Sequence, residues 1–316
     1  MNGSEVYRRI IESGIMPTTF VYDVAETVSL SRTLHENGIR VIELLQRTPD
    51  ALRAVGAVKE AIPGMVVGAG TVRTLEAAKE AAAAGADYIV SPYYSQEIVD
   101  WCCGHGVAVI PGCATITEVS CGYQSGLRYF KYFPVKQLGG VEAIRQISEI
   151  YSDVRYVVTG GISYDDLLEF APNPYVMAVG TVCMMPRELV AAHDWNKIAK
   201  LTRQTVAGSL GLELMYVDRS RLDAAGRRLA EALSLYSQAR GHVPEIPEEV
   251  QNLSGNPVAG LYANSLERAL AFFRELGLDG RVLVNGENMA PVVADVQVPA
   301  LGGGLRLVAR HHVYKT

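Results

Sequence analysis

Short apolar runs alternate with longer amphipathic stretches between about residue 15 and residue 181. The runs are rich in β-branched residues, and their alternation with the longer stretches predicts parallel strands joined by helices. Eight runs fit this pattern: 15–22, 41–46, 66–72, 88–92, 108–113, 129–134, 156–161 and 175–180. Eight strand–helix units match the number that closes a (β/α)8 barrel of the TIM type.

The stretches between the runs predict helices at 25–37, 50–61, 75–84, 140–150 and 164–170, with Gly38 and Gly85 ending the first and third of them. Residues 3–13 predict an extra helix that covers the floor of the barrel, and residues 194–208 predict the last barrel helix. The barrel then occupies about 210 residues, near the lower end for this fold.

Polar and glycine residues cluster at the carboxyl ends of the runs. An open doubly wound sheet would give the same alternation of strands and helices, but it would scatter these residues along an edge. A barrel brings them together at one mouth, where catalytic groups lie. We therefore favour the barrel. The residues are Glu43, Arg47, Thr71, Ser91, Lys131, Thr159, Gly160 and Gly161.

The pattern changes after residue 210. A charged, Ala- and Leu-rich stretch predicts a helix at 223–240, and the Pro- and Gly-containing stretch 241–257 is typical of a linker. Beyond it, a strand at 258–263, a helix at 266–276 capped by Asn264 or Ser265, and strands at 281–284, 292–297 and 305–311 give a βαβββ order. We predict a barrel (1–210), a helix-and-linker segment (211–257) and a small α+β domain (258–316).

The composition changes this picture little but excludes some partners. The chain has 316 residues, 49% hydrophobic and 20% charged, which is typical of globular proteins with a sizeable core. A formal charge of -5 provides no basic field for nucleic acid or an anionic membrane, and no apolar run approaches the roughly 20 residues that cross a bilayer. We expect a soluble protein without nucleic-acid or membrane partners.

The five cysteines and six histidines do not form a recognisable metal motif. Cys102 and Cys103 are adjacent and lack the two-residue spacer of a zinc or redox pair, and His311 and His312 would point to opposite faces of a strand. An odd number of cysteines without a secretory leader indicates reduced core thiols in a cytoplasmic protein. We expect no metal.

One lysine lies within an aromatic strand, the segment YFKYFP at 129–134. Desolvation of Lys131 would favour the neutral amine, which can attack a ketone. The alternative is a structural lysine whose stem packs on the aromatic rings while its head reaches water or a carboxylate.

A second ionisable group, Glu43, lies in the apolar run 41–45, and Arg47 ends the same run. A carboxyl group in apolar surroundings suits acid–base catalysis, and the guanidinium fork suits the carboxylate of a 2-keto acid. Internal ion pairs are the alternative, but burying charges seldom repays their desolvation. Together with Lys131, these residues favour a catalytic site.

Two glycine-rich turns complete the predicted mouth, at 68–71 after the third strand and at 159–162 after the seventh. The loops after strands seven and eight of a barrel commonly bind phosphate, and Gly160, Gly161, Gly180 and Thr181 are suitably placed for this. The alternative is that the glycines only permit tight turns.

Across nearly all of residues 10–208, these motifs occur in the order and at the spacing of one enzyme family. They are VIE (41–43) with Arg47 and Thr48, VGAGT (67–71), SP (91–92), IPG (110–112) with Thr115 and Glu118, FKYFP (130–134) and TGGIS (159–163). The chain resembles the 2-keto-3-deoxy-6-phosphogluconate (KDPG) aldolases and 4-hydroxy-2-oxoglutarate (KHG) aldolases.

This resemblance implies a class I, Schiff-base aldolase that needs no metal or other cofactor, releases pyruvate and an aldehyde from its 2-keto acid substrate, and assembles as a homotrimer. It implies that Lys131 forms the imine, that Glu43 moves protons, and that Arg47 and Thr71 hold the carboxylate. The distal end of the substrate would approach the two glycines that follow the seventh strand. The full set of substrate-binding candidates is Arg47, Thr71, Pro111, Phe133, Thr159, Gly160, Gly161, Gly180 and Thr181.

The chain departs from the family at the distal end of the site. Thr181 and Val182 stand where the family often has a Gly-Ser pair that completes a phosphate cup, and a valine side chain cannot donate a hydrogen bond. Leu45 and Gln46 also replace the more usual residues between the acid and the arginine. Whether the substrate is phosphorylated stays open.

The expected mechanism begins with attack of Lys131 on the C2 ketone, and the protonated imine then accepts the electrons released when the C3–C4 bond breaks. Glu43, through a water molecule, would take the proton of the C4 hydroxyl. Two alternatives remain: a sugar-phosphate isomerase or epimerase in which Lys131 is purely electrostatic, and a non-catalytic keto-acid sensor.

Residues 258–310 resemble one βαβββ half of the glyoxalase and dioxygenase-type modules. The usual metal-ligand position in the first strand falls near Leu261 and Tyr262, which are poor ligands, and only Glu287 and His311 remain as candidates. We expect a packing or oligomerisation role for this domain.

Overall fold

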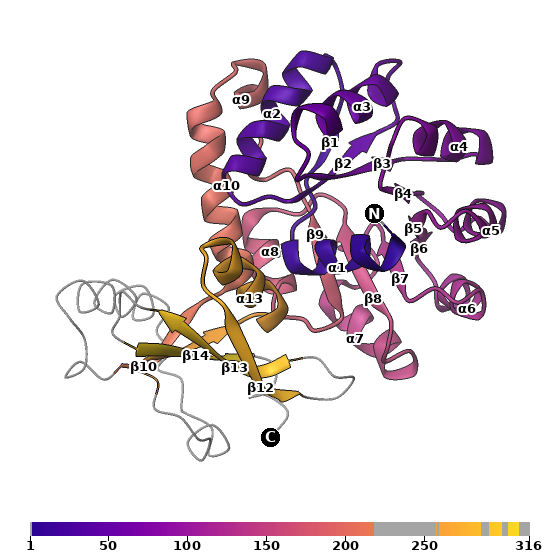
Figure 1. Ribbon diagram of the computed structural model, residues 1–316. Coiled ribbons are helices and arrows are strands. Elements are labelled where there is room, and N and C mark those ends of the chain that lie inside the picture. The colour runs from indigo at the N-terminus through magenta and orange to yellow at the C-terminus, as the bar shows by residue number, and fades with distance from the viewer. Residues whose placement is uncertain (1, 218–256, 258, 286–290, 299–302, 310–316) are drawn as a thin grey trace. The chain divides into compact units, whose positions relative to one another are not determined.

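Parallel strands alternate with helices in the first of two compact units, Met1–Ser209 and Leu210–Thr316, of the computed structural model (Figure 1). The structure describes residues 2–217, 257, 259–285, 291–298 and 303–309. The first unit contains α1 (Gly3–Ser13), β1 (Thr18–Phe20), α2 (Val24–Glu36), β2 (Val41–Leu45), α3 (Ala51–Ala61), β3 (Val66–Gly70), α4 (Leu75–Ala83), β4 (Tyr88–Val90), α5 (Gln96–Gly104), β5 (Ala108–Ile110), β6 (Gly112–Cys113), α6 (Ile116–Gln124), β7 (Tyr129–Tyr132), α7 (Gly140–Ile150), β8 (Arg155–Thr159), α8 (Tyr164–Phe170), β9 (Val176–Gly180), α9 (Arg187–Ala191) and α10 (Trp195–Leu210).

The strands form a closed ring, which confirms the predicted barrel. Strands β1 to β5 pair in order, and so do β6 to β9. The two sheets are continuous through Pro111, which lies between β5 and β6, and a parallel bridge between Ile15 and Val179 joins β9 back to the start of β1. The fifth predicted run is therefore divided into two strands at a proline, which cannot donate a ladder hydrogen bond.

Two apolar clusters lie on opposite sides of the strand ring. One cluster, which includes Ile42, Val67 and Val158, packs the strands against the surrounding helices. The other, which includes Val41, Val66 and Val157, fills the inside of the ring. Since side chains alternate across a strand, the positions two residues further along also lie on the inner face: Glu43 on β2, Gly68 on β3 and Thr159 at the end of β8.

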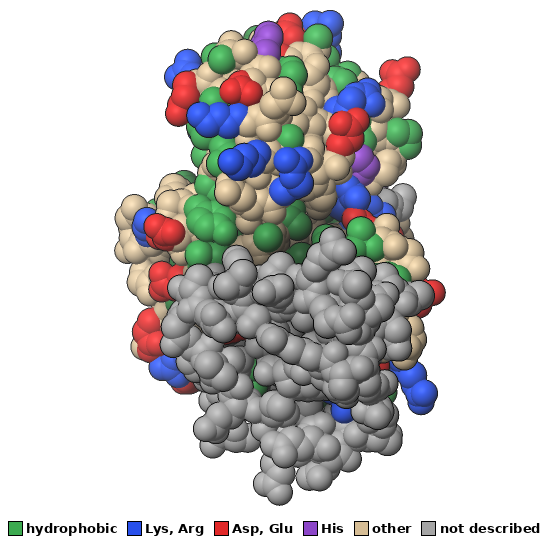
Figure 2. All heavy atoms as spheres, turned by 90° about the vertical axis from the view of Figure 1, so that its left-hand side faces the viewer, with side chains coloured by type: hydrophobic (Ala, Val, Ile, Leu, Met, Phe, Trp, Pro, Cys, Tyr) green, Lys and Arg blue, Asp and Glu red, His purple; other side chains and the backbone are tan. Residues whose placement is uncertain are grey.

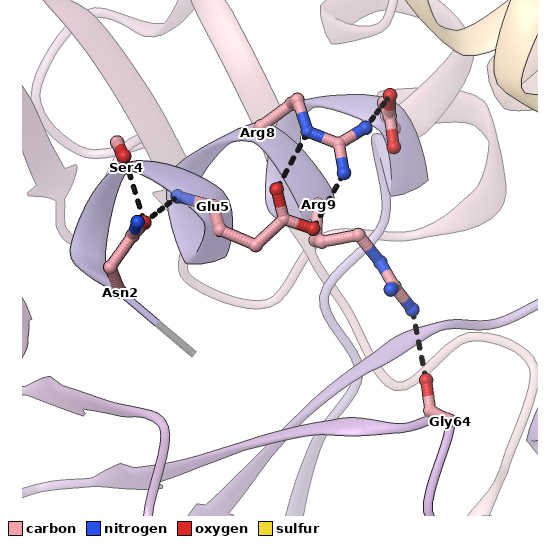
Figure 3. Close-up of polar contacts among 7 residues, drawn as sticks. Asn2, Ser4, Glu5, Arg8, Arg9 and Gly64 are labelled. Atoms are coloured by element: carbon pink, nitrogen blue, oxygen red, sulfur yellow. Dashed lines mark hydrogen bonds and ion pairs between the residues drawn. The ribbon is translucent and has the colours of Figure 1, made fainter.

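Helix α1 covers the amino-terminal end of the barrel, as the sequence predicted. Its Val6 and Ile10 are buried in the inner cluster, and the Tyr7 hydroxyl donates to the Val109 carbonyl at 2.9 Å. Arg9 donates to the carbonyl of Gly64, just before β3, at 2.9 Å, and Asn2 caps the helix by accepting from the backbone N–H of Glu5 (Figure 3). The floor is thus closed, and the opposite end of the barrel is left for chemistry.

The second unit is a five-stranded sheet with one described helix. It contains β10 (Glu213–Val217), β11 (Ala259–Ala263), α13 (Leu266–Glu275), β12 (Gly280–Asn285), β13 (Pro291–Val298) and β14 (Gly303–Ala309). The strand order is β10-β11-β14-β13-β12, with β11 and β14 parallel and the other pairs antiparallel. Arg306 on β14 makes a bidentate ion pair with its cross-strand neighbour Asp295 on β13, at 2.9 Å for both bonds.

The described elements from β11 to β14 have the βαβββ order expected for residues 258–316, but the segment before them differs from the expectation. Residues 213–217, which fall in the predicted helix-and-linker segment, form β10 and pair antiparallel with β11. This pairing satisfies the backbone groups of one edge of β11. The expected helix at 223–240, almost all of the linker at 241–257, and the candidate ligands Glu287 and His311 lie outside the described residues.

The cysteines are only partly in the core. All five are free thiols, but Cys102 and Cys113 alone are buried, whereas Cys103 and Cys121 are exposed and Cys183 is intermediate. The expectation of five core thiols was therefore wrong, because the amphipathic helices α5 and α6 turn Cys103 and Cys121 to the surface.

The described surface carries charges of both signs. Figure 2 shows Lys and Arg side chains next to Asp and Glu side chains, with apolar side chains between them, on the face turned to the viewer. Among the described residues, none of the helices combines the length and the apolar character required of a membrane span.

Candidate active site

Lys131 on β7 and Glu43 on β2 face each other inside the barrel. The Lys131 Nζ lies 3.3 Å from the Glu43 Oε1, and the two residues are 8% and 0% exposed. The second carboxylate oxygen, Glu43 Oε2, is buried and has no hydrogen-bond partner in the part of the chain that the structure describes. A buried amine and a carboxylate with an unused acceptor can exchange protons with each other and with a bound molecule.

Glycines on β3 make the space that Glu43 occupies. A Cβ atom at Gly70 would lie 2.0 Å from Glu43 Oε1, and one at Gly68 would lie 2.2 Å from the ring of Tyr88. Both glycines lie within β3, and our interpretation of 68–70 as a turn after the third strand was therefore wrong. The physical reason for these glycines is the close approach of side chains across the barrel interior.

Tyr88 fills the barrel interior next to Gly68. It is fully buried, and its hydroxyl donates to the Ile42 carbonyl at 2.9 Å. Burial, followed by the charge of Glu43, raises the pKa of Tyr88 well above its usual range. The phenol thus stays protonated and holds the backbone of β2 immediately before Glu43.

Aromatic and backbone groups surround the lysine. The Phe133 ring centroid lies 5.7 Å from Lys131 Nζ, and Phe133 is 40% exposed, so this ring contacts solvent as well as lying near the amine. The Lys131 backbone N–H donates to the Pro111 carbonyl at 2.9 Å. Pro111 is therefore a neighbour of Lys131 through its backbone, in the break between β5 and β6.

Arg47 and Thr71 form a second polar pair at the rim. Arg47 Nε donates to Thr71 Oγ1 at 3.1 Å, and the guanidinium carbon lies 5.2 Å from the centroid of the Phe20 ring. Thr71 has a φ of 59°, a conformation that costs a β-branched residue of order 1–3 kcal/mol. Such strain is typical of functional sites, and here it presents the Thr71 hydroxyl to Arg47.

The position of Arg47 differs from the expectation. Strand β2 ends at Leu45, and Arg47 lies two residues beyond it with its side chain exposed. Lys131 and Glu43 are therefore the buried ionisable groups of this site, whereas Arg47 is not buried. An exposed guanidinium keeps its charge at little cost and can receive a carboxylate from solvent.

Thr159 ends β8 inside the barrel. It is 5% exposed, and its hydroxyl has no hydrogen-bond partner among the described residues. Its register partner on β9 is Gly180, where a Cβ atom would lie 2.3 Å from Thr159 Cγ2. Gly180 therefore serves to accommodate the threonine side chain, a role that the sequence did not reveal.

The loops after β8 and β9 bond mainly to themselves. Gly160 and Gly161 have positive φ angles of 126° and 64°, which glycine adopts readily. Ser163 forms a capping box with Asp166 at the start of α8, and the Thr181 hydroxyl donates to the Ile162 carbonyl at 2.6 Å. Thr181 is 2% exposed, so its side chain belongs to the loop framework.

The structure thus joins Lys131 directly to Glu43 and Arg47 directly to Thr71. Sequence reasoning missed Tyr88 and Asp166 and gave Gly70 the wrong role. An alternation of glycine with small residues inside a predicted strand is a signal for close approach, and it was available for 68–70. In the described part of the chain, no group of three or more His, Cys, Asp or Glu residues is arranged to hold a metal ion.

Comparison with known proteins agrees with this geometry. The profile of the family described as "Aldolase: KDPG and KHG aldolase" matches residues 6–201. A 2-dehydro-3-deoxy-phosphogluconate aldolase of Treponema pallidum (strain Nichols) is 38% identical over 192 residues, 61% of this chain and 91% of the relative. The KHG/KDPG aldolase of Escherichia coli (strain K12) is 32% identical over 195 residues, 62% of this chain and 92% of the relative.

A solved structure is similar over the same region. The KDPG aldolase from Legionella pneumophila, crystallised with pyruvate captured at low pH as a covalent carbinolamine intermediate, superposes with a TM-score of 0.61 at 29% identity. The match covers 63% of this chain and 97% of that protein. The comparisons favour an aldolase over the isomerase and sensor alternatives. The chain belongs to the KDPG and KHG aldolase family and is a class I aldolase, a carbon–carbon lyase that needs no metal.

Proposed function

We propose that Lys131 is the covalent nucleophile of this aldolase and that Glu43 is its proton-transfer group. The observation that carries the proposal is the distance of 3.3 Å between Lys131 Nζ and Glu43 Oε1, in a pair that is almost fully buried. If Lys131 only neutralised the charge of Glu43, the second carboxylate oxygen, Glu43 Oε2, would not need to be left without a hydrogen-bond partner.

The reaction follows from these two groups. Glu43 accepts a proton from the Lys131 ammonium, and the neutral amine attacks the C2 carbonyl of a 2-keto acid to give a carbinolamine. Loss of water, with the proton supplied by Glu43, leaves a protonated imine. This cation is the electron sink for the next step.

Cleavage needs a base for the C4 hydroxyl. Glu43, directly or through a water molecule, takes that proton, the C3–C4 bond breaks, and the bonding electrons move into the imine to form an enamine. The aldehyde leaves, Glu43 returns the proton to C3, and hydrolysis of the imine releases pyruvate and free Lys131. One carboxyl group therefore serves each proton transfer in turn.

Arg47 and Thr71 are proposed to hold the carboxylate next to the ketone. Arg47 uses only Nε in its bond to Thr71, so its terminal nitrogens can bind a carboxylate in a bidentate manner. The strained backbone conformation of Thr71 keeps its hydroxyl next to Arg47. Phe133 and Pro111 would bound the site around C3 and C4.

The proposed substrate is a 2-keto-3-deoxy sugar acid or 4-hydroxy-2-oxoglutarate, and the aldehyde product is then a glyceraldehyde derivative or glyoxylate. Thr159, with its unpartnered buried hydroxyl, is proposed to bond to a hydroxyl group of the bound chain. Gly160, Gly161, Gly180 and Thr181 would border the distal end.

Borohydride trapping tests the nucleophile. The full chain is incubated with pyruvate and sodium borohydride, digested and analysed by mass spectrometry. We expect one reduced pyruvyl group on the peptide that contains Lys131, and none in the Lys131→Met variant. Modification of another lysine, or none with the native chain, contradicts the proposal.

We further propose that the protein acts in the cytoplasm as a homo-oligomer, in particular a trimer. The five free thiols are compatible with a reducing compartment, and the trimer rests on the family resemblance. Light scattering on the full chain after size-exclusion chromatography should give three times the chain mass. A monomer contradicts the oligomer proposal.

A further inference from the structure

The loops after β8 and β9 are the place where a (β/α)8 barrel commonly binds phosphate, through backbone N–H groups and hydroxyls directed at the ligand. In this chain they span residues 160–163 and 181–185. A loop can bind a dianion only with donors that are not already engaged, because each hydrogen bond broken within the protein must be replaced.

Ser163, the last residue of the first loop, uses its donors on an acidic residue of the protein itself. The backbone N–H of Ser163 donates to Asp166 Oδ2 at 2.8 Å, and the Ser163 hydroxyl donates to the same oxygen at 2.7 Å. The Asp166 N–H donates back to the Ser163 hydroxyl at 3.2 Å. Both hydrogen-bond donors of Ser163 are therefore used on the carboxylate of Asp166.

The second loop is engaged in the same way. The Thr181 hydroxyl donates to the Ile162 carbonyl at 2.6 Å and accepts from the Cys183 backbone N–H at 3.1 Å. The Met185 N–H donates to the Val182 carbonyl at 2.9 Å. Neither the hydroxyl of Thr181 nor the N–H of Cys183 is left for a ligand.

The charge at these loops is also unfavourable for an anion. The hydrogen bond from Lys136, followed by those from Ser163, lowers the pKa of Asp166 to about 2, so its carboxylate is ionised at neutral pH. Lys136 Nζ lies 2.9 Å from Asp166 Oδ2, so this cation is already paired. A phosphate dianion placed here would meet a fixed negative charge.

The side chain that the second loop exposes is apolar. Val182 is 50% exposed. Phe133, which stands over Lys131, is 40% exposed. These two exposed side chains suit carbon groups of a ligand better than an anion.

We propose that this barrel acts on an unphosphorylated 2-keto-3-deoxy sugar acid whose distal end is uncharged, and that Asp166 excludes the phosphorylated form. The inference rests on the proposed function, because it takes Lys131 as the position of C2 and Arg47 as the position of the carboxylate. It adds the chemical class of the distal group and a specificity-determining residue.

The test compares two substrates on the full chain. Pyruvate release from 2-keto-3-deoxygluconate and from its 6-phosphate is followed with lactate dehydrogenase, and kcat/KM is determined for each. We expect kcat/KM to be at least threefold higher for the unphosphorylated substrate. Any lower ratio, including a preference for the phosphate ester, overturns the proposal.

The variant Asp166→Asn tests the role of the charge. Asparagine keeps an acceptor for Ser163 but removes the negative charge, so kcat/KM for the phosphate ester should rise at least threefold relative to the unphosphorylated substrate. Asp165→Asn, one residue away on the exposed surface of α8, is the matched control and should leave the ratio within twofold. If the ratio of kcat/KM for the two substrates changes by less than threefold in Asp166→Asn, Asp166 is not the residue that excludes the phosphate ester.

Two measurements keep the result decisive. Inhibition of the native chain by glyceraldehyde and by glyceraldehyde 3-phosphate needs no variant, and glyceraldehyde is expected to be at least as strong an inhibitor as its phosphate ester; tighter inhibition by the phosphate ester overturns the proposal. Borohydride trapping of pyruvate on Lys131 is run in parallel for every variant. If the native chain fails to trap pyruvate, the proposed function fails; if it traps pyruvate but prefers the phosphate ester, only the present inference fails.

Discussion

The two halves of the barrel mouth contain similar residue types but use them in opposite ways. In the pyruvate half, formed by Lys131, Glu43, Arg47 and Thr71, the buried Glu43 Oε2 has no hydrogen-bond partner among the described residues, and Thr71 is held in a strained conformation. In the distal half, formed by Lys136, Ser163, Asp166, Thr181 and Val182, the polar groups bond to each other. An unsatisfied buried polar atom costs about 1–3 kcal/mol, so its retention points to a ligand.

This difference explains why equal numbers of polar residues do not imply equal binding capacity. The pyruvate half is preorganised for chemistry at the expense of stability, as is usual for catalytic sites. The distal half stabilises its loops through caps and an ion pair, and it therefore contributes to specificity mainly by exclusion. Substitutions in the first half should reduce turnover, whereas those in the second should affect stability and substrate choice.

Each half contains one lysine, and the largest effect is expected for Lys131 in the pyruvate half. Lys131→Met removes the nucleophile, and we expect kcat for pyruvate release to fall by a factor on the order of 10⁴ or more, because no imine forms. Lys136→Met removes only the partner of Asp166 and should change kcat by less than threefold. Steady-state kinetics of both variants measure this difference. Equal reductions of kcat in Lys131→Met and Lys136→Met would contradict the proposed difference between the two halves.

Glu43→Gln should have the next largest effect. The amide keeps the size of the side chain but cannot accept and return protons, so kcat should fall by about 10²- to 10⁴-fold. Glu118→Gln, which retains an amide oxygen for the cap of α6, is the control and should keep nearly full activity. Turnover is measured with pre-steady-state and steady-state assays; near-native kcat in Glu43→Gln would remove Glu43 from the mechanism.

Gly70→Ala tests whether space on β3 positions Glu43. The added Cβ would lie 2.0 Å from Glu43 Oε1 and must displace that carboxylate, which is the flexible end of a side chain. We expect kcat to fall about 10- to 100-fold with the fold retained. The circular dichroism spectrum checks the fold, and Gly104→Ala, where the added atom meets open space, is the control. Unchanged kcat would show that Glu43 acts from another position.

Arg47→Lys should act on binding. A lysine keeps the charge but loses the bidentate fork and the contact with Phe20, so KM for the 2-keto acid should rise about tenfold while kcat stays within threefold. Arg53→Lys, on the surface of α3, is the matched control. A kcat loss larger than the KM effect would place Arg47 in the chemical step.

The smallest effect concerns stability in the distal half. Asp166→Asn should lower the free energy of unfolding of the barrel by about 0.5–1 kcal/mol at pH 7, through weaker capping and the lost ion pair. The pKa of Asp166 is lowered from 3.8 to about 2 in the folded state. Its contribution is therefore fully present above pH 3.8 and is lost as the pH falls through about 2.

Urea denaturation measures this difference, because both tryptophans, Trp101 and Trp195, lie in the first unit and report its unfolding. The gap between the native chain and Asp166→Asn should be constant from pH 7 to pH 4.5 and should shrink below pH 3.8. Asp165→Asn should show no such gap. A gap that widens in acid would mean that Asp166 is not stabilised as an anion.

Much of the barrel could be predicted from sequence because its signals are local. The period of apolar residues located the eight strands, and Gly38 and Gly85 do end helices with positive φ angles of 102° and 94°. The split of the fifth strand at Pro111 and the edge strand at 213–217 were not predicted. Strand pairing depends on partners distant in sequence, which a local pattern does not contain.

The site was predicted unevenly for the same reason. By itself, the sequence determined the barrel and the presence of a lysine and a glutamate in apolar strands, since residue type and periodicity fix which face a strand side chain takes. Only the tertiary structure decided that Gly70 makes room for Glu43 and that Ser163 and Thr181 are already bonded within the protein. The space around a side chain and the hydrogen-bond donors still available to a ligand depend on which residues are neighbours in the folded protein. They cannot be inferred from residue type alone.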